Sequence, residues 1–293
     1  MFLTIFTPVY NRGHLVKRVY DTLCRQQSFG FEWLVINDGS TDNTDAVLRD
    51  IIANHGLPFA INYVSRENRG LMRTINQALD LAKGELFCRV DSDDYATDNL
   101  VSSIQQYWPS IADDDRLCSL AFLSQNEHSQ IVGYHPFHNL KRCNFTDYRS
   151  RFGGIGDRNE VMKTAVFRHF KFPEFEGEKF CPEGLVWNRI ARKYDALYVP
   201  EAIYVKESTS DSITADIYRY LRRNADGVTL YYIEIVKDKS QPVKYRWINA
   251  VKYYRYSAVS KRACAKEMPV SFALTAYPVG LIVRLYDKIK NKK

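Results

Sequence analysis

The sequence contains no apolar run of about 18 residues, the length that a membrane-spanning helix needs. Its first six residues are mostly apolar and lack the basic n-region of a signal peptide. Pro8 and Asn11 also follow sooner than a signal peptide allows. We therefore expect neither a spanning helix nor a secretory leader, so that any contact with a membrane would be peripheral.

Cysteines are few and scattered along the chain. None forms a Cys-x-x-Cys pair, and none has a histidine at the spacing of a metal site; the six are Cys24, Cys88, Cys118, Cys143, Cys181 and Cys264. This distribution argues against a disulfide framework and against a zinc site. We expect inert thiols in a reducing cytoplasm.

Acidic residues are nearly absent from the last part of the chain. From Pro242 onward the only acids are Glu267 and Asp287, against twelve lysines and arginines, which gives this segment a net charge of +10. The whole chain carries +7, so the preceding residues sum to −3. Such asymmetry indicates an anionic partner for the C-terminal segment.

Apolar strands alternate with helical patterns over the first hundred residues. Strands are expected at 3–6, 31–36, 59–64 and 86–90, with helices at 15–23, 46–52 and 71–82. This rhythm predicts an α/β fold with a mostly parallel sheet and helices on both faces. Ligands of such sheets bind outside the carboxyl ends of the strands. The polar residues Asn11, Asp38, Arg66 and Asp91 each follow a strand.

The remaining chain is less regular. Strands are expected at 117–123 and 131–134, a glycine-rich loop at 152–157, a helix near 185–191, and helices from about residue 217. No repeat or linker indicates a separable second domain. We therefore predict a domain over 1–215, with a donor-binding half (1–125) and an acceptor half (126–215), followed by a basic, Tyr-rich helical extension over 216–293.

Two carboxylates, Asp91 and Asp93, follow the fourth strand one residue apart. Hard divalent ions such as Mg²⁺ and Mn²⁺ prefer oxygen ligands, and carboxylates commonly hold them together with substrate phosphates. The Asp-x-Asp pattern is weak by itself, because the acids at 113–115 also match it; we expect those in an exposed turn. The alternative is an acidic loop in which Asp94 caps the next helix.

Four motifs in order strengthen the metal interpretation. Thr-Pro-Val-Tyr-Asn stands at 7–11, Asn-Asp-Gly-Ser-Thr-Asp at 37–42, Glu-Asn-Arg-Gly at 67–70 and Asp-Ser-Asp-Asp at 91–94. Together they resemble the inverting family-two glycosyltransferases with the GT-A fold, including bacterial capsule and exopolysaccharide enzymes. The resemblance covers roughly the first hundred residues and is specific as an ordered set.

The resemblance implies that Thr7, Pro8, Val9 and Asn11 line the nucleoside site. Pro8 and Asn11 could instead simply form a turn.

Asp38 would accept a hydrogen bond from the base, usually uracil. The alternative for Asp38 is a turn followed by a helix cap. Many relatives carry Asp where this chain has Asn37, a departure that leaves the base-contacting position intact.

The donor diphosphate would lie near Arg66, Gly70, Arg73 and Ser92, with Asp91 and Asp93 holding Mn²⁺ or Mg²⁺. Backbone N–H groups at a helix start favour anions, and an arginine there could orient Asp91 through a salt bridge. The alternative for Arg73 is a solvated helix face.

An inverting displacement needs a general base for the acceptor hydroxyl. In a similar subgroup of bacterial polysaccharide transferases, the base is an acid just before a Trp-containing helix, which corresponds here to Glu183, one turn before Trp187. The alternative for Glu183 is an ordinary first-turn glutamate. Asp157, in the glycine-rich loop, is the rival base, and the other acids at 174–178 are expected in a solvated loop.

The predicted function is therefore metal-assisted transfer of a hexose-type sugar from a nucleoside diphosphate donor to a glycan or lipid-linked acceptor of a bacterial surface polysaccharide. We expect uridine as the nucleoside. One alternative is a nucleotidyltransferase that makes the sugar nucleotide, although residues 7–12 lack the glycines of its phosphate loop. Another is a non-catalytic nucleotide-binding scaffold.

The C-terminal segment interleaves cations with tyrosines and ends in a short apolar stretch, 279–286, followed by lysines. Basic amphipathic helices with aromatic anchors bind the membrane interface. Nucleic-acid binding and simple packing on the core are the alternatives. Lipid-linked acceptors favour a membrane, so we expect peripheral contact at the inner face of the cell membrane and no nucleic-acid partner.

Overall fold

A computed structural model of the chain describes residues 1–56, 58–207, 217–262 and 267–290. Its internal contacts divide the chain into two units. The first comprises Met1–Lys171 and Ile190–Thr209, and the second comprises Phe172–Arg189 and Ser210–Lys293. Residues 172–189, which we expected in an acceptor half, thus group with the C-terminal helices, and the division into two halves stays a prediction.

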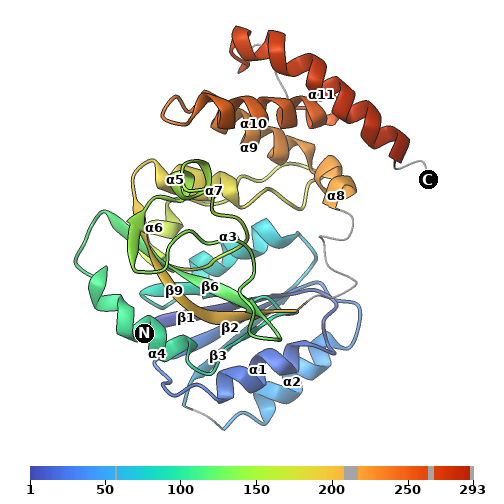
Figure 1. The fold of residues 1–293 in the computed structure, drawn as a ribbon. Coiled ribbons are helices and arrows are strands. Elements are labelled where there is room, and N and C mark those ends of the chain that lie inside the picture. Colours follow the sequence, from blue (N-terminus) through green and yellow to red (C-terminus); the bar gives the residue numbers. More distant parts are fainter. Residues whose placement is uncertain (57, 208–216, 263–266, 291–293) are drawn as a thin grey trace. The chain divides into compact units, whose positions relative to one another are not determined.

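The first unit is built on one sheet whose first four strands are parallel (Figure 1). The order across the sheet is β3-β2-β1-β4-β8-β6-β9-β5, and β7 pairs with β9. The strands are β1 (Leu3–Val9), β2 (Phe31–Asp38), β3 (Ala60–Arg66), β4 (Leu86–Arg89), β5 (Tyr95–Ala96), β6 (Leu117–Asn126), β7 (Lys141–Cys143), β8 (Asn159–Lys163) and β9 (Asp195–Lys206). The predicted parallel arrangement of the first strands is confirmed.

Helices cover both faces of this sheet, because successive side chains of a buried strand point to opposite sides. Leu3 and Ile5 of β1 lie in one core with Val19 of α1. Phe6 points the other way, with its ring centroid 5.6 Å from that of Phe87. Figure 1 shows α1 and α2 on one side of the sheet and α3 on the other. The helices of this unit are α1 (Val16–Cys24), α2 (Thr44–Ala53), α3 (Leu71–Leu81), α4 (Leu100–Tyr107), α5 (Phe145–Ser150) and α6 (Thr164–Arg168).

One predicted strand, 131–134, is wrong. Ile131 and Tyr134 form only isolated bridges, to Gln125 and Ile155. Between them Gly133 has a φ of +91°, and a Cβ there would lie 2.2 Å from the Ile155 carbonyl oxygen. This left-handed residue turns the chain and ends the extended run. The turn expected at 113–115 is confirmed, since β6 begins directly after it.

The second unit consists of helices joined to the loop 172–183. Its helices are α7 (Gly184–Ala191), which begins in this unit, α8 (Ile217–Arg223), α9 (Ala225–Lys237), α10 (Val243–Tyr256) and α11 (Val270–Lys290). Glu178 accepts hydrogen bonds from the N–H groups of Asp226 (2.7 Å) and Gly227 (2.9 Å) at the start of α9. The expectation of a wholly solvated loop was therefore wrong for Glu178, which satisfies free N–H groups of a helix N-terminus.

Helix α11 packs along α10 by one of its sides. Gly280 permits this approach, because a Cβ there would lie 2.5 Å from the Cβ of Tyr254. Trp247 of α10 donates a hydrogen bond from Nε1 to Thr275 Oγ1 (3.1 Å). The predicted helical C-terminal extension is confirmed. Tyrosines contribute to its packing: the rings of Tyr254 in α10 and Tyr277 in α11 have centroids 5.1 Å apart, and those of Tyr232 in α9 and Tyr256 in α10 stack with centroids 6.2 Å apart.

Candidate active site

The loops after β1 and β2 are tied together by hydrogen bonds. Asn11, which has a positive φ of 52°, donates its N–H to Ser40 Oγ (2.9 Å). The Asn11 side-chain oxygen accepts from the N–H of Thr41 (2.8 Å). Gly13 likewise donates its N–H to Asp42 (3.2 Å). These hydrogen bonds hold Asn11 in one conformation at the carboxyl end of β1.

Two other residues predicted at the nucleoside site point into the core. Thr7 is buried, and its hydroxyl accepts a hydrogen bond from Trp33 Nε1 (2.9 Å). Val9 is buried with the same core. Pro8, between them, is partly exposed. Thr7 and Val9 can therefore contribute to the site only by holding the end of β1 in place. Pro8 and Asn11 are partly exposed to solvent.

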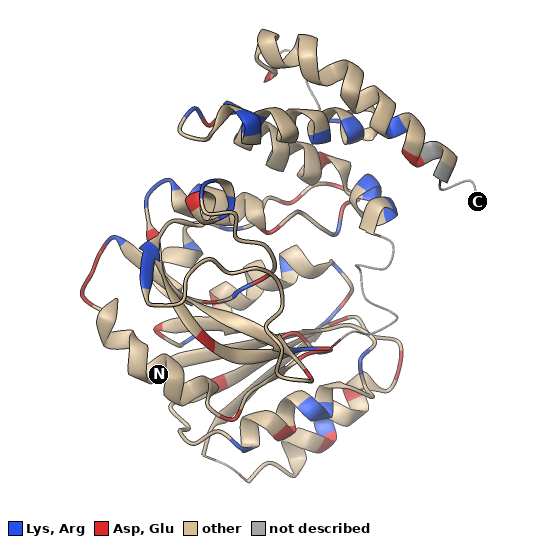
Figure 2. Cartoon of the chain, viewed as in Figure 1, with Lys and Arg blue, Asp and Glu red and all other residues tan. Residues whose placement is uncertain are grey.

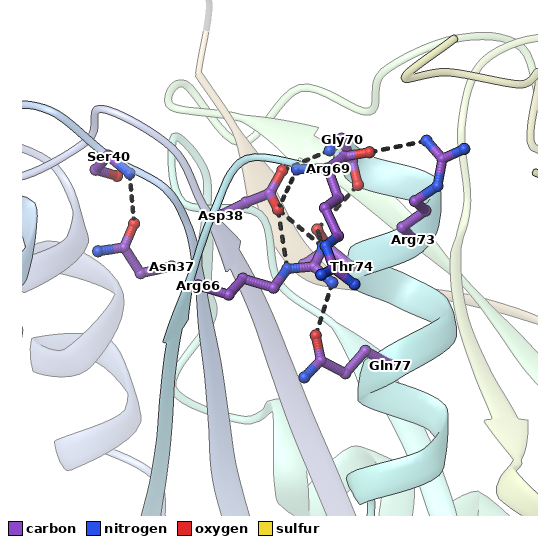
Figure 3. A network of polar contacts seen from close by, with 9 residues as sticks. All are labelled: Asn37, Asp38, Ser40, Arg66, Arg69, Gly70, Arg73, Thr74 and Gln77. Atoms are coloured by element: carbon purple, nitrogen blue, oxygen red, sulfur yellow. Dashed lines mark hydrogen bonds and ion pairs between the residues drawn. The ribbon is translucent and has the colours of Figure 1, made fainter. Parts of the chain in front are cut away.

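Asp38 is the centre of a polar network at the end of β2 (Figure 3). Its oxygens accept hydrogen bonds from the N–H groups of Arg69 (3.0 Å) and Gly70 (2.7 Å). The Arg66 guanidinium adds contacts of 3.0 Å from Nε and 2.8 Å from Nη2. Three of these contacts fall on Oδ1, and only the Gly70 N–H reaches Oδ2. A hydrogen bond from a nucleobase would therefore have to share Oδ2 with Gly70.

The residues predicted around the diphosphate take part in the same network. Arg66 also donates to Gln77 (2.7 Å) and Thr74 (2.6 Å). Arg73 donates to the carbonyl of Arg69 (3.1 Å). Because Asp38 receives the Gly70 N–H, this group is already engaged at the start of α3. The network fixes the β3–α3 loop against β2.

The segment 91–94 follows β4 and is held from β9. Tyr204 donates its hydroxyl hydrogen to Asp94 Oδ2 (2.8 Å) and accepts from the N–H of Asp91 (3.1 Å). Glu207 donates its N–H to Asp94 Oδ1 (3.0 Å). Burial, and then the neighbouring Asp91, raise the pKa of Asp94 to about 6. The alternative in which Asp94 caps the next helix is wrong, because α4 begins after Asn99.

Asp91 and Asp93 remain open to solvent. Their side chains are 30% and 28% exposed, with Asp91 Oδ1 at 3.1 Å from Arg89 Nε and Asp93 Oδ2 at 3.9 Å from Arg12 Nη2. An arginine does orient Asp91, but it belongs to β4 rather than to the start of α3. Ser92, between them, is buried.

Arg18 of α1 is a residue of this site that the sequence alone did not reveal. Its Nη2 donates to the backbone carbonyl of Asp93 (2.7 Å), and its guanidinium lies 4.8 Å from the ring centroid of Tyr95. It also forms an ion pair with Glu207. Arg18 is separated from Tyr204 and Glu207 by nearly the whole first unit in sequence, so no local motif joins it to them. A strand pattern at 195–206 is the signal that could have indicated Tyr204.

The donor set fits a hard divalent cation. Two partly exposed carboxylates stand one residue apart, and oxygen ligands suit Mg²⁺ and Mn²⁺. Within the described parts of the chain, no group of three or more His, Cys, Asp or Glu side chains is placed to hold a metal. A cation at Asp91 and Asp93 would therefore complete its coordination with substrate oxygens and water.

The two predicted bases lie in different units. Asp157 lies in the first unit, where Lys206 Nζ is 2.6 Å from its carboxylate. Burial opposes ionisation of Asp157, but Lys206, Arg149 and Arg89 outweigh it and lower its pKa. A lowered pKa makes a carboxylate a weaker proton acceptor. Glu183 lies in the second unit, directly before α7, and its carbonyl accepts from the N–H of Val186 (2.9 Å).

The profile of the family "Glycosyl transferase family 2" matches residues 4–171, more than half of the chain. The chain belongs to this family. A chondroitin synthase and a hyaluronan synthase of Pasteurella multocida are each 33% identical to it over 93 residues, which are 32% of this chain and 9% of theirs. The chain thus spans less than a tenth of these relatives' length. An uncharacterised glycosyltransferase of Haemophilus influenzae is 22% identical over 74% of this chain and 68% of its own.

Solved structures with bound nucleotide sugars share the fold. Staphylococcus aureus TarS 1–349 in complex with UDP-GlcNAc superposes with a TM-score of 0.66 and 18% identity, over 89% of this chain and 74% of that one. The mannosyltransferase PcManGT from Pyrobaculum calidifontis, in complex with GDP-Man and Mn²⁺, gives a TM-score of 0.57 and 15% identity, over 98% and 87%. The predicted GT-A fold with a helical C-terminal extension is confirmed.

Proposed function

We propose that the chain transfers a hexose-type sugar from a nucleoside diphosphate donor, with uridine as the nucleoside, to a glycan or lipid-linked acceptor with inversion. The observation that carries this proposal is the pair of partly exposed carboxylates, Asp91 and Asp93, beyond the carboxyl end of β4. The family and the position of this pair on a parallel sheet support it. TarS, solved with UDP-GlcNAc, supports uridine.

Asp91 and Asp93 would hold Mn²⁺ or Mg²⁺, which neutralises charge on the departing diphosphate when it is bound. PcManGT, solved with Mn²⁺, supports this choice of metal. The chain's own residues fix the two carboxylates in place: Tyr204 holds the backbone of Asp91, and Arg18 holds the backbone of Asp93. Arg66 and Asp38 hold the β3–α3 loop that faces the same edge of the sheet. Such preorganisation spares the site reorganisation during the reaction.

Glu183 is the proposed general base, and Asp157 the alternative. The ion pair of Asp157 with Lys206 supports this order, because the lysine stabilises the ionised carboxylate and weakens it as a base. Glu183→Gln is expected to retain donor binding and to lose sugar transfer. Retained transfer in this variant would move the base to Asp157 or elsewhere.

The acceptor belongs, in this proposal, to a bacterial surface polysaccharide assembled at the inner face of the membrane. The chondroitin and hyaluronan synthases among the relatives support a polysaccharide product. No helix in the described part of the chain is long and apolar enough to cross a bilayer. We accordingly propose peripheral contact through the basic residues of 216–293.

A donor screen by thermal unfolding in the presence of Mn²⁺ tests the proposal. A ligand that binds the folded state at 100 times its Kd adds about 2.7 kcal/mol of stability, which raises Tm by several degrees. We expect this shift with a uridine diphosphate sugar and a smaller shift without the metal. If no nucleoside diphosphate sugar raises Tm, the proposal fails.

A further inference from the structure

Helix α11 is apolar on two opposite sides. The side that packs on α10 carries Phe272, Ala276 and Gly280, which recur every four residues and are buried. The opposite side carries exposed apolar residues, here named the outer stripe: Val270, Leu274, Ile282, Leu285 and Ile289. A surface helix of a globular protein ordinarily presents charged and polar residues on that side.

The outer stripe is unusually exposed for its composition. Leu274 is 74% exposed and Leu285 is 56% exposed. Figure 2 shows long stretches of α11 without any charged residue. Single exposed leucines are common, but a contiguous apolar surface marks a site of interaction.

The C-terminal segment that contains the stripe exposes positive charge, and its two acids are paired. Lys244 of α10, with Lys261 and Arg262 before α11, are exposed. The two acids from Pro242 onward are both paired: Glu267 lies 2.6 Å from Lys237, and Asp287 lies 2.5 Å from Arg255. The C-terminal segment that carries the outer stripe is therefore cationic.

This charge decides between two occupants of the stripe. A second copy of the chain would bring a segment of +10 against another of +10, and like charges repel. A bilayer surface with anionic headgroups complements the same charge, and its acyl region accepts the apolar side chains. The helix is not apolar enough to span the bilayer.

We propose that the outer stripe of α11 lies in the boundary between headgroups and acyl chains of a bilayer containing anionic lipid, with the helix axis along the membrane plane. Exposed cations, including Lys261 and Arg262, contact the headgroups. One side of α11 thus packs on α10 while the other binds lipid, so the packing and membrane interpretations of the sequence both apply. This inference names the surface for the peripheral contact proposed above.

Flotation of the full chain with vesicles tests the inference. Vesicles of phosphatidylcholine mixed with phosphatidylglycerol are expected to recover the protein, and vesicles of phosphatidylcholine alone to recover much less. The double variant Leu274→Gln with Leu285→Gln removes apolar surface without adding charge, and its partition should fall at least about tenfold. The variant Lys261→Gln with Arg262→Gln should lose part of the preference for anionic vesicles.

A matched control carries Ile52→Gln with Ile131→Gln, two exposed apolar residues of the first unit, and should float like the wild type. All variants should keep the wild-type Tm and the donor-induced shift. That shift is measured without vesicles, so a failure of donor binding is distinguishable from a failure of membrane binding.

Unchanged flotation of the stripe variant would overturn the inference, as would a wild-type chain that no vesicle recovers. Analytical sedimentation tests the other possible occupant, a second copy of the chain. A wild-type dimer that the stripe variant converts to a monomer, together with absent vesicle binding, would assign the stripe to a second copy.

Discussion

Asp38 at the end of β2 is buried and receives four donor groups, whereas Asp91 and Asp93 beyond β4 are about 30% exposed and face Arg89 and Arg12. All three acids follow strands of the same parallel sheet. The first carboxylate holds a loop together, and the other two keep oxygens available for a ligand. An acid at a strand end can therefore belong to the scaffold of a site or to its ligand-binding surface, and its partners decide which.

The largest effect is expected from Asp93→Asn. This change removes a proposed metal ligand from a partly exposed side chain, so metal-dependent donor hydrolysis should fall at least about a hundredfold. The free energy of unfolding should stay within about 0.5 kcal/mol of the wild type. Asp115→Asn, in the other Asp-x-Asp turn, is the control and should retain full hydrolysis; equal losses in both would contradict the assignment.

Asp38→Asn is expected to lower the stability of the fold more than Asp93→Asn does. Removing the charge leaves the largely buried Arg66 guanidinium (13% exposed) without its ionised partner, and the free energy of unfolding should fall by about 3 kcal/mol, measured by urea denaturation. Asp80→Asn, which breaks the exposed pair with Lys171, should cost less than about 1 kcal/mol. A stable Asp38→Asn chain with weakened uridine binding would instead make Asp38 chiefly a base contact.

A smaller effect is expected from Tyr204→Phe. This substitution removes the hydroxyl that joins Asp91 and Asp94. Loss of such supporting hydrogen bonds typically weakens metal affinity by about 10-fold or more, so the apparent Kd for Mn²⁺ should rise while metal-free nucleotide binding is unchanged. Tyr198→Phe, a buried tyrosine of the same strand, is the control.

The smallest effect is expected from a change at Asp157. Burial raises the pKa of this carboxyl, but Lys206 and two arginines lower it by more, so the net pKa is lowered. A carboxylate with a lowered folded-state pKa stabilises the fold above its unfolded pKa of about 3.9, and this contribution is lost as the pH falls through the folded value. Asp157→Asn should therefore lower stability by less than about 1 kcal/mol at neutral pH. Neighbouring atoms partly desolvate the carboxylate, but its side chain is 71% exposed, so solvent screens the ion pair with Lys206. The difference from wild type should vanish in acid.

Local patterns in the sequence predicted the parallel strands, their helices and the polar residues at the strand ends. Asp91 and Asp93 were found because a strand and its following loop are continuous in sequence. The support from Tyr204 and Arg18 was not found, because β9 and α1 are distant from this loop in sequence and contact it only in the folded unit. The engagement of Asp38 by four donor groups was also hidden, since these donors come from a strand end and loop about thirty residues away.

Binding of Mn²⁺ in the presence of UDP, followed by electron paramagnetic resonance of the free ion, tests the central claim most directly. We expect UDP and the wild-type chain together to remove one equivalent of the free Mn²⁺ signal per chain, and Asp93→Asn with UDP to remove much less at the same concentrations. Equal binding of Mn²⁺ by wild type and Asp93→Asn would contradict the assignment of the β4 loop as the metal site.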